Sequence, residues 1–255
     1  MAEDADGADG FALFLDFDGT LVEIAPTPDA VQVAPALPAD LEALRTRLGG
    51  ALAIVTGRPV ATIDAFLGPR GFDVGGMHGG EIRHSGHLAG CVPSEHPLLR
   101  EAVEAFTRTL SALEGVLIED KGCSVAIHWR LAAPDAAQEA ESMVERMASG
   151  LRPRYRLQRG KAVAEILPAN STKGEAIRTF QRLAPYTGRR AVFFGDDLTD
   201  EEAFKTVNAD GGLSVRVGEG MTAAVHRLAT PAEVRAVLAG WAAGGPVDPA
   251  ALPAA

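Results

Sequence analysis

The chain has 255 residues, of which 47% are hydrophobic, and it carries a formal net charge of −10. This length allows one large domain or two small ones, and the composition is ordinary for a folded globular protein. We expect neither nucleic acid nor a membrane as a partner, because the chain has no long basic stretch and no run of about 18 apolar residues.

The amino terminus and the cysteines bear on the cellular compartment. Residues 1–9 are acidic and polar, lack the basic and apolar regions of a signal peptide, and are expected to form a disordered tail. Cys91 and Cys123 make no disulfide framework and have no metal-ligand spacing, so we expect two reduced packing residues. The sequence therefore predicts a cytoplasmic protein.

Helices and strands are predicted to alternate in the two terminal parts of the chain. The first part predicts strand 11–15, helix 37–48, strand 51–55, helix 60–67 and a glycine-rich stretch at 75–83. The last part predicts helix 174–183, strand 191–195, helix 199–207, strand 213–217 and helix 231–241. Such alternation is typical of an α/β fold with a doubly wound, Rossmann-like parallel sheet and helices on both faces.

The middle of the chain has a different pattern. It predicts, in order, helix 98–113, strands 116–119 and 124–130, helix 134–147, and strands 155–158 and 162–167. This αββαββ order is typical of an α+β unit with a small antiparallel sheet. We therefore expect 90–168 to be an inserted cap domain, and 1–89 with 169–255 to form one discontinuous core. The Gly-, Pro- and Ala-rich end, 244–255, is expected to be disordered.

The first predicted strand ends on two carboxylates, Asp16 and Asp18, which precede a glycine. This arrangement can perform covalent phosphoryl chemistry, with Asp16 attacking phosphorus and Asp18 moving the proton. Taken alone, the same Asp-x-Asp-Gly-Thr string also fits an Asx-type turn after a strand.

Three further segments agree with the catalytic interpretation. One apolar run ends on Thr56-Gly57-Arg58, a predicted helix begins at Lys173-Gly174, and another apolar strand ends in the acidic cluster 195–201. Parallel sheets bind ligands beyond the carboxyl ends of their strands, so we expect side chains from these segments to converge there. The side chains expected to converge are those of Asp16, Asp18, Thr56, Asp196 and Asp197.

These four segments, in this order, resemble the signature motifs of the haloacid dehalogenase-like (HAD) phosphohydrolase superfamily. The resemblance implies an aspartyl-phosphate mechanism, a Mg²⁺ cofactor and a doubly wound core with a mobile cap. The presence of Asp18 indicates that the chain is not one of the ATPases or dehalogenases of the superfamily, which lack this second carboxylate.

Oxygen ligands for Mg²⁺ are available in the first and fourth motifs. The carboxylates of Asp16 and Asp196 and the main-chain carbonyl of Asp18 would supply three of them. Asp197 and Asp200 would lie behind these ligands, holding waters or orienting the lysine of the third motif. A cluster that caps the amino terminus of the following helix is the alternative for these two aspartates.

Three other side chains are predicted to act on the phosphoryl group or support the site. Thr56 can donate a hydrogen bond to a phosphoryl oxygen, and Lys173 can neutralise that oxygen and shield Asp16 from repulsion by like charges. Arg58 either holds the site together or pairs with a carboxylate of the core, and the sequence leaves both options open.

The cap is expected to select the alcohol side of the ester. Alternation in the strand 124–130 places Ser124, His128 and Arg130 on one face, and Lys161 shares a face with Glu165 in a later strand. Glu119 and Lys121 come just before the first of these strands. Such a face suits a ligand rich in hydroxyls, although a solvated face with charge pairs fits the same pattern.

The chain is similar to the trehalose-6-phosphate phosphatase family, whose cap is of the C2B type, over nearly its whole length. The similarity rests on the core motifs and on the strings Gly76–Glu81, Glu119–Lys121, His128–Arg130 and Gly160-Lys161 with Glu165. It implies hydrolysis of trehalose 6-phosphate to trehalose and phosphate, and a functional pairing with a trehalose-6-phosphate synthase. The substrate-binding residues it implies are Thr56, Arg58, His78, Glu119, Lys121, His128, Arg130, Lys161 and Glu165.

Other functions remain as alternatives at this stage. A phosphatase of sucrose 6-phosphate or of a glycosyl-3-phosphoglycerate would use the same core, and a mutase would return the phosphoryl group to a second hydroxyl. A non-catalytic sugar-phosphate sensor, or a partner subunit of a synthase, belongs to a different class and would bind without turnover.

Overall fold

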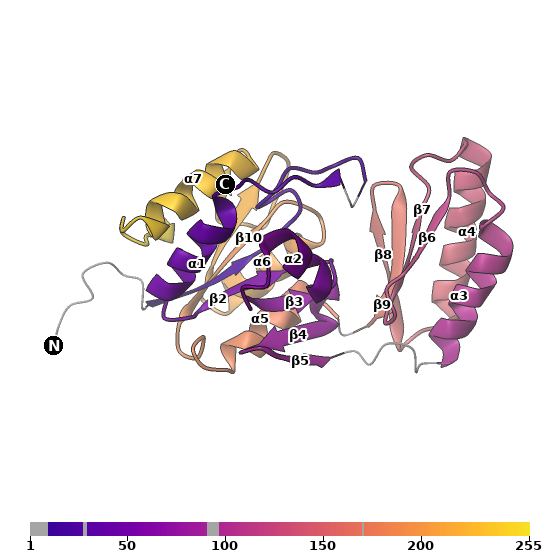
Figure 1. Cartoon of the computed structure of the whole chain (residues 1–255). Helices are drawn as coiled ribbons and strands as arrows, with labels where there is room; N and C mark the ends of the chain where they lie inside the picture. Colours follow the sequence, from indigo (N-terminus) through magenta and orange to yellow (C-terminus); the bar gives the residue numbers. More distant parts are fainter. Residues whose placement is uncertain (1–9, 28–29, 91–96, 170) are drawn as a thin grey trace. The chain divides into compact units, whose positions relative to one another are not determined.

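The computed structural model describes residues 10–27, 30–90, 97–169 and 171–255. The chain divides into two compact units (Figure 1). Unit 1 is Met1–Ala89 with Thr172–Ala255, and unit 2 is Gly90–Ser171. Each unit encloses its own cluster of buried hydrophobic side chains. No helix in the described parts of the chain is long and apolar enough to cross a membrane.

Unit 1 is built on an eight-stranded sheet with the order β12-β11-β10-β1-β2-β3-β4-β5. The neighbours from β12 to β3 pair in parallel, and β4 runs antiparallel to β3. The strands are β1 (Phe11–Leu15), β2 (Leu52–Val55), β3 (Asp73–Gly76), β4 (Glu81–His84), β5 (His87–Gly90), β10 (Arg190–Gly195), β11 (Leu213–Val217) and β12 (His226–Leu228).

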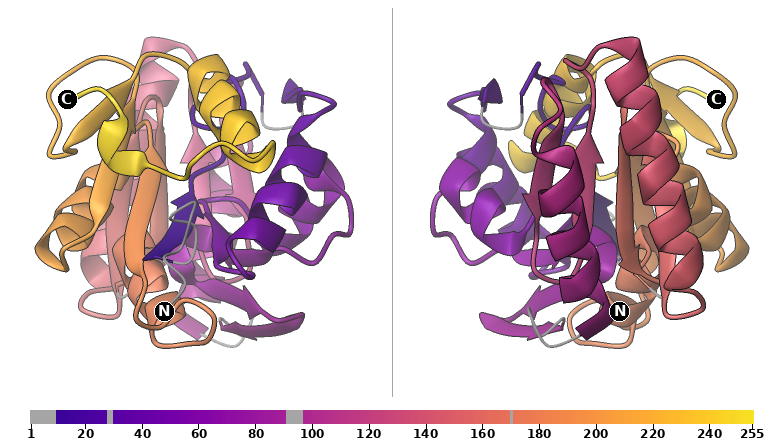
Figure 2. Two further views of the ribbon diagram at one scale, coloured as in Figure 1. Left: turned by 90° about the vertical axis from the view of Figure 1, so that its left-hand side faces the viewer. Right: turned by 90° about the vertical axis from the view of Figure 1, so that its right-hand side faces the viewer.

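Helices cover both faces of this sheet, which explains why its central strands are apolar throughout (Figure 2). On one face α1 (Leu37–Arg47) contacts α7 (Pro231–Ala242), and on the other α5 (Lys173–Gln181) contacts α6 (Asp200–Ala209). The shorter α2 (Val60–Leu67) joins β2 to β3. The expected α/β class with a doubly wound parallel sheet is confirmed.

The pairing register brings the ends of the central strands together. Leu15, the last residue of β1, lies opposite Phe194 of β10, and Gly195 of β10 lies opposite Arg216 of β11. The segments that follow β1 and β10 therefore leave the sheet side by side at its carboxyl edge, which positions the site described below.

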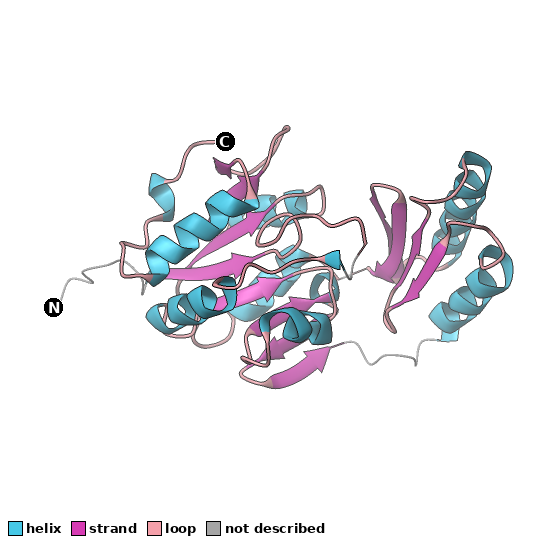
Figure 3. Cartoon of the chain, turned by 45° about the horizontal axis from the view of Figure 1, so that its top comes forward, coloured by secondary structure: helices cyan, strands magenta, loops and turns pink. Residues whose placement is uncertain are grey.

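Unit 2 is a four-stranded antiparallel sheet with the order β6-β7-β9-β8 and two helices on one face (Figure 3). Leu99, Ala102, Phe106 and Leu110 recur at helical spacing on α3, and all four are buried. They pack with Val125, Ile127, Ala164 and Ile166 of the sheet. The elements are α3 (Pro97–Leu110), β6 (Leu117–Asp120), β7 (Val125–His128), α4 (Pro134–Gly150), β8 (Tyr155–Gly160) and β9 (Val163–Pro168).

The structure corrects the expectation that residues 244–255 are disordered. Val247 is buried against the core of unit 1, a short 3₁₀ helix spans Pro249–Ala251, and Ala254 forms an isolated β-bridge with His226. Composition misled the prediction because a segment rich in small residues is held here by a few contacts with the core of unit 1, which composition does not show. The other expected tail, 1–9, lies outside the described residues.

The expectation that both cysteines are reduced was also wrong, because Cys123 is disulfide-bonded. The chain contains one other cysteine, Cys91, which lies outside the described residues. The spacing in the sequence gave no sign of a disulfide, since a single pair of cysteines has no recognisable framework.

Candidate active site

Three carboxylates meet at the carboxyl edge of the unit 1 sheet. One oxygen each from Asp16, Asp196 and Asp200 lies within 4.8 Å of the others. Asp16 directly follows β1, and its backbone N–H donates to the carbonyl of Phe194, 3.0 Å away, on the neighbouring strand. Asp196 directly follows β10, and Asp200 begins α6. The carboxylate cluster thus forms where two central strands end.

Lys173 supplies the positive charge inside this cluster. Its Nζ lies 2.9 Å from Oδ1 of Asp16 and 2.7 Å from Oδ1 of Asp200. The side chains of Lys173 and Asp200 are 3% and 0% exposed, so the ion pair is shielded from solvent. Lys173 is the first residue of α5, and the hydroxyl of Thr172 caps that helix by accepting from the backbone N–H of Glu175.

The Asp200 carboxylate holds the backbone of the loop that carries Asp196. Oδ2 of Asp200 accepts from the backbone N–H groups of Asp196, at 3.0 Å, and of Asp197, at 3.1 Å. Two glycines make room for this arrangement. A Cβ on Gly195 would lie 2.5 Å from Cγ of Asp200, and one on Gly19, whose φ is +77°, would lie 2.0 Å from Oδ2 of Asp196.

The electrostatics of the cluster oppose the charged form of its carboxyls. Burial raises the pKa of Asp16 well above its usual range, with Lys173 working against this and the neighbouring aspartates adding to it. Burial, together with Asp200 and Asp197, raises the pKa of Asp196 to about 7. Burial also raises the pKa of Asp200, although Lys173 opposes it.

Lys173 and Asp197 respond in the opposite sense. Burial alone would lower the pKa of Lys173, but the negative charges of Asp16 and Asp200 outweigh it and raise the pKa well above the usual lysine value. Burial would raise the pKa of Asp197, but Lys173 and two hydrogen bonds from Thr199 lower it instead. The surroundings of Lys173 therefore favour its cationic form, and those of Asp197 favour its anionic form.

A divalent cation fits this donor set. Two buried carboxylates and one half-buried carboxylate face a single ammonium group, so the cluster has an excess of negative charge and of oxygen donors. Hard cations such as Mg²⁺ take oxygen ligands of this kind. Of the expected ligands, Asp16 and Asp196 lie in the cluster. Asp200 also lies in the cluster, although the sequence predicted it behind the ligands. It contacts Lys173, in agreement with the expectation that it could orient that lysine.

Arg58 pairs with Asp18, and this contact fits both options that the sequence left open, because Asp18 is itself a candidate site residue. Its Nε donates to Oδ2 of Asp18 at 2.6 Å and its second guanidinium nitrogen to Oδ1 at 2.8 Å. The guanidinium carbon also lies over the rings of Phe17 and Phe66, at 6.0 and 5.1 Å from the ring centres. The bidentate contact fixes the Asp18 carboxylate in one orientation.

A backbone hydrogen bond joins His78 to Thr56. Thr56 follows β2 and is buried, and its hydroxyl accepts from the backbone N–H of Arg58 at 3.2 Å. The backbone N–H of His78 donates to the carbonyl of Thr56 at 2.9 Å, and His78 has a left-handed φ of 55°. A Cβ on Gly57 would lie 2.6 Å from Nε2 of His78, so a larger residue at position 57 would require the His78 ring to move.

Unit 2 has a polar cluster of its own on the face of the sheet away from its helices. Ser124 donates to Oε1 of Glu165 at 2.6 Å, and Nζ of Lys121 lies 3.3 Å from Oε2 of the same carboxylate. Nε2 of His128 lies 2.9 Å from Oε2 of Glu119. We call these five residues the unit 2 polar cluster. Arg130 instead donates to the backbone carbonyl of Lys161, at 3.3 Å.

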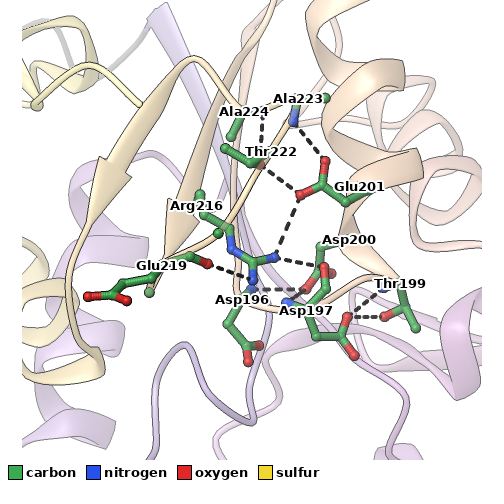
Figure 4. Close-up of polar contacts among 12 residues, drawn as sticks. Asp196, Asp197, Thr199, Asp200, Glu201, Arg216, Glu219, Thr222, Ala223 and Ala224 are labelled. Carbon is green, nitrogen blue, oxygen red and sulfur yellow. Dashed lines mark hydrogen bonds and ion pairs between the residues drawn. The ribbon is translucent and has the colours of Figure 1, made fainter. Parts of the chain in front are cut away.

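Arg216 was not among the candidate residues, and Glu201 was included only as the last residue of the acidic cluster 195–201 with no role assigned. Arg216 is the penultimate residue of β11 and lies opposite Gly195, directly before Asp196 (Figure 4). Its position near the carboxyl end of a parallel strand was the available signal. Arg216, Asp196, Gly19 and Glu23 help to line a cavity of about 380 Å³ in unit 1.

The fold and its acidic cluster define the class of this protein, a HAD-like phosphohydrolase. The family model described as trehalose-phosphatase matches residues 14–231, and the chain belongs to that family. It is 47% identical, over 82% of its length and 78% of the relative's, to a probable trehalose-phosphate phosphatase of Sinorhizobium fredii. It is 39% identical, over 86% and 82% of the two chains, to the trehalose-6-phosphate phosphatase of Escherichia coli.

Solved structures agree with this assignment. A crystal structure described as a trehalose-6-phosphate phosphatase related protein superposes with a TM-score of 0.74 at 29% identity, covering 89% of this chain and 95% of that one. The C-terminal domain of the Candida albicans trehalose-6-phosphate phosphatase, at 23% identity and a TM-score of 0.79, covers 93% of each chain and shows the same fold. Trehalose-phosphatases are phosphoric monoester hydrolases, and this chain is an enzyme of that class.

The excess of buried negative charge predicts that Mg²⁺ stabilises the protein. A cation bound only by the folded state raises the free energy of unfolding by about 2.7 kcal/mol at roughly 100 times its dissociation constant. Thermal melting in EDTA and in rising Mg²⁺ should show an increasing Tm for the wild type. The Tm of Asp196→Asn should respond much less, and a wild-type Tm that ignores Mg²⁺ would contradict the assignment.

Proposed function

We propose that the protein is a Mg²⁺-dependent phosphatase that hydrolyses trehalose 6-phosphate to trehalose and phosphate through an aspartyl-phosphate at Asp16. The observation that carries the proposal is the buried contact of Asp16 with Lys173, beside Asp196 and Asp200, in a chain of the trehalose-phosphatase family. Phosphatase relatives at 47% and 39% identity support the choice of substrate.

The proposed reaction has two steps, both centred on Asp16. In the first, a carboxylate oxygen of Asp16 attacks phosphorus, the bond from phosphorus to the sugar oxygen breaks, and Asp18 gives its proton to the departing alcohol. In the second, Asp18 takes a proton from a water molecule that attacks the phosphorus of the aspartyl-phosphate. Phosphate leaves and the Asp16 carboxylate is restored, so that atoms and charges balance.

The other core residues hold these groups in place. Lys173 opposes the rise in the pKa of Asp16 that burial causes and so favours its ionised form, and Thr56 is proposed to donate to a phosphoryl oxygen. Arg58 fixes the Asp18 carboxylate through its bidentate contact. The Arg58 guanidinium is also proposed to contact the substrate. Mg²⁺, held by Asp16, Asp196 and the main-chain carbonyl of Asp18, supplies charge neutralisation for the phosphoryl group when it is bound.

Unit 2 is proposed to bind the sugar. The unit 2 polar cluster offers two carboxylates, an ammonium, a hydroxyl and an imidazole, which together can accept from and donate to the hydroxyls of a disaccharide. Arg130, Lys161 and, in unit 1, His78 are further proposed contacts. Glu119 and Glu165 disfavour a glycosyl-3-phosphoglycerate, whose glycerate carboxylate would be repelled by them.

The core proposal is tested by phosphate release from a panel of esters. With Mg²⁺, trehalose 6-phosphate should be hydrolysed much faster than sucrose 6-phosphate, glucose 6-phosphate or glucosyl-3-phosphoglycerate. Asp16→Asn should release no phosphate above background, because an amide cannot attack phosphorus. Turnover by Asp16→Asn would contradict the covalent mechanism. Preference for another ester would contradict the assigned substrate but leave the core chemistry standing, and binding without turnover would favour a sensor.

The role of unit 2 predicts a selective effect of Glu165→Gln. A lost hydrogen bond to a charged group costs about 1.5–3 kcal/mol, so kcat/KM for trehalose 6-phosphate should fall roughly 10- to 100-fold. The rate with p-nitrophenyl phosphate, which has no sugar, should stay within about twofold. Glu145→Gln is a matched control, since Glu145 is an exposed carboxylate of the same unit that pairs with Arg159. Equal loss on both substrates would place Glu165 outside sugar binding.

A further inference from the structure

Arg216 makes contact with the loop that carries Asp196. One guanidinium nitrogen of Arg216 donates to the backbone carbonyl of Asp197 at 3.0 Å and lies 3.6 Å from Oε1 of Glu201. The other terminal nitrogen donates to the carbonyl of Glu219 at 3.4 Å. The Arg216 side chain is only 15% exposed, so its guanidinium is held close to these partners.

Glu201 is itself held in position, which makes it a fixed partner for Arg216. Its Oε1 accepts from the hydroxyl of Thr222 at 2.7 Å, and its Oε2 accepts from the backbone N–H of Ala223 at 2.8 Å. Figure 4 shows Arg216 between this carboxylate, the Asp197 segment and the loop that bears Glu219. The guanidinium therefore joins the segment 197–201 to the loop that follows its own strand, which it contacts at Glu219.

The peptide segment 196–197 is consequently held from two sides. Asp200 accepts from both of its N–H groups, and Arg216 donates to the carbonyl at its far end. Backbone groups fixed at both ends leave the segment little freedom to rotate, and its rotation would turn the Asp196 carboxylate away from Asp16. Partners of this kind, one step removed from a metal, orient the ligands that bind it.

We propose that Arg216 is a positioning residue that aims the Asp196 carboxylate at the cation through the Asp197 carbonyl. This inference rests on the proposed function, because it concerns the metal that the acidic cluster would hold. Arg216 contacts neither the cation nor the substrate in this account. Its contribution is to the affinity for the metal, and it leaves binding of the sugar phosphate untouched.

A second arginine offers a matched control. Arg227, on β12, donates to the carbonyls of Gly218 and Gly220, so it anchors the same loop that Arg216 reaches through Glu219. None of the contacts that the structure gives for Arg227 reaches the segment 196–200. If anchoring that loop were the whole role of Arg216, loss of either arginine would have the same effect.

The experiment measures Mg²⁺ binding by isothermal titration calorimetry on the full chain without substrate. Arg216→Met, which keeps the length of the side chain but removes its donors, should weaken Mg²⁺ binding about 10- to 100-fold. The Mg²⁺ concentration for half-maximal activity should rise by the same factor, whereas KM for trehalose 6-phosphate at saturating Mg²⁺ should stay within about twofold. Arg216→Lys should recover part of the affinity, and Arg227→Met should bind Mg²⁺ like the wild type.

Several outcomes would overturn the inference, and they are distinct from failure of the proposed function. Arg216→Met that binds Mg²⁺ within about twofold of the wild type, or Arg227→Met that loses as much affinity, would remove the assigned role. If melting shows that Arg216→Met does not fold, Arg216→Lys must still bind Mg²⁺ more weakly than the wild type and than Arg227→Lys. A wild type that binds no Mg²⁺ would overturn the metal dependence itself, and this inference with it.

Discussion

The buried contact of Lys173 with Asp16 and Asp200 is the interaction on which the rest of the site depends. Three carboxylates whose oxygens lie within 4.8 Å of one another would repel strongly away from solvent. The ammonium group between two of them offsets part of that repulsion and favours the ionised form of Asp16, the proposed nucleophile. Removing one partner from a buried ion pair leaves an uncompensated charge, so Lys173 is needed for stability as well as for the proposed chemistry.

The sheet makes this contact geometrically accessible. Parallel pairing of β1 with β10 places Asp16 and Asp196 at neighbouring strand ends, and the start of α5 brings Lys173 to the same edge. Around this centre, Gly19 leaves room for the Asp196 carboxylate and Gly195 leaves room for the Asp200 carboxylate. Arg58 holds the Asp18 carboxylate, and Arg216 holds the acidic loop at the Asp197 carbonyl. The strand ends, the two glycines and the two arginines thus restrict the movement of the charged side chains in this site.

The sequence could place Asp16 and Asp196 at one edge of the sheet because each follows a continuous apolar run. Phe11–Leu15 and Ala191–Gly195 are read as buried strands from their length and composition, so the aspartates after them could be placed at one edge. Glycine-rich β3 has a single valine as its apolar signal, and β12 has three residues, so neither was assigned as a strand. Short elements of this kind are fixed by pairing with neighbours, which no local pattern reveals.

Contacts between distant segments were beyond the reach of the sequence for the same reason. Arg216 looked like any polar residue in a strand until its register opposite Gly195 was known. Asp200 was predicted to lie behind the ligands, holding waters or orienting Lys173, yet one of its oxygens lies within 4.8 Å of those of Asp16 and Asp196. Residues 244–255 were misjudged because burial of Val247 depends on the shape of unit 1.

The central claim is that Asp16 becomes phosphorylated, and mass spectrometry of an Asp18→Asn variant tests it most directly. Without the Asp18 carboxyl, water attack on the aspartyl-phosphate should slow, so that the intermediate accumulates during incubation with trehalose 6-phosphate and Mg²⁺. Rapid acid quenching and digestion should then yield the peptide containing Asp16 with one added phosphoryl group, and Asp16→Asn should yield none. Release of trehalose by the variant with no phosphoryl group on that peptide would contradict the account.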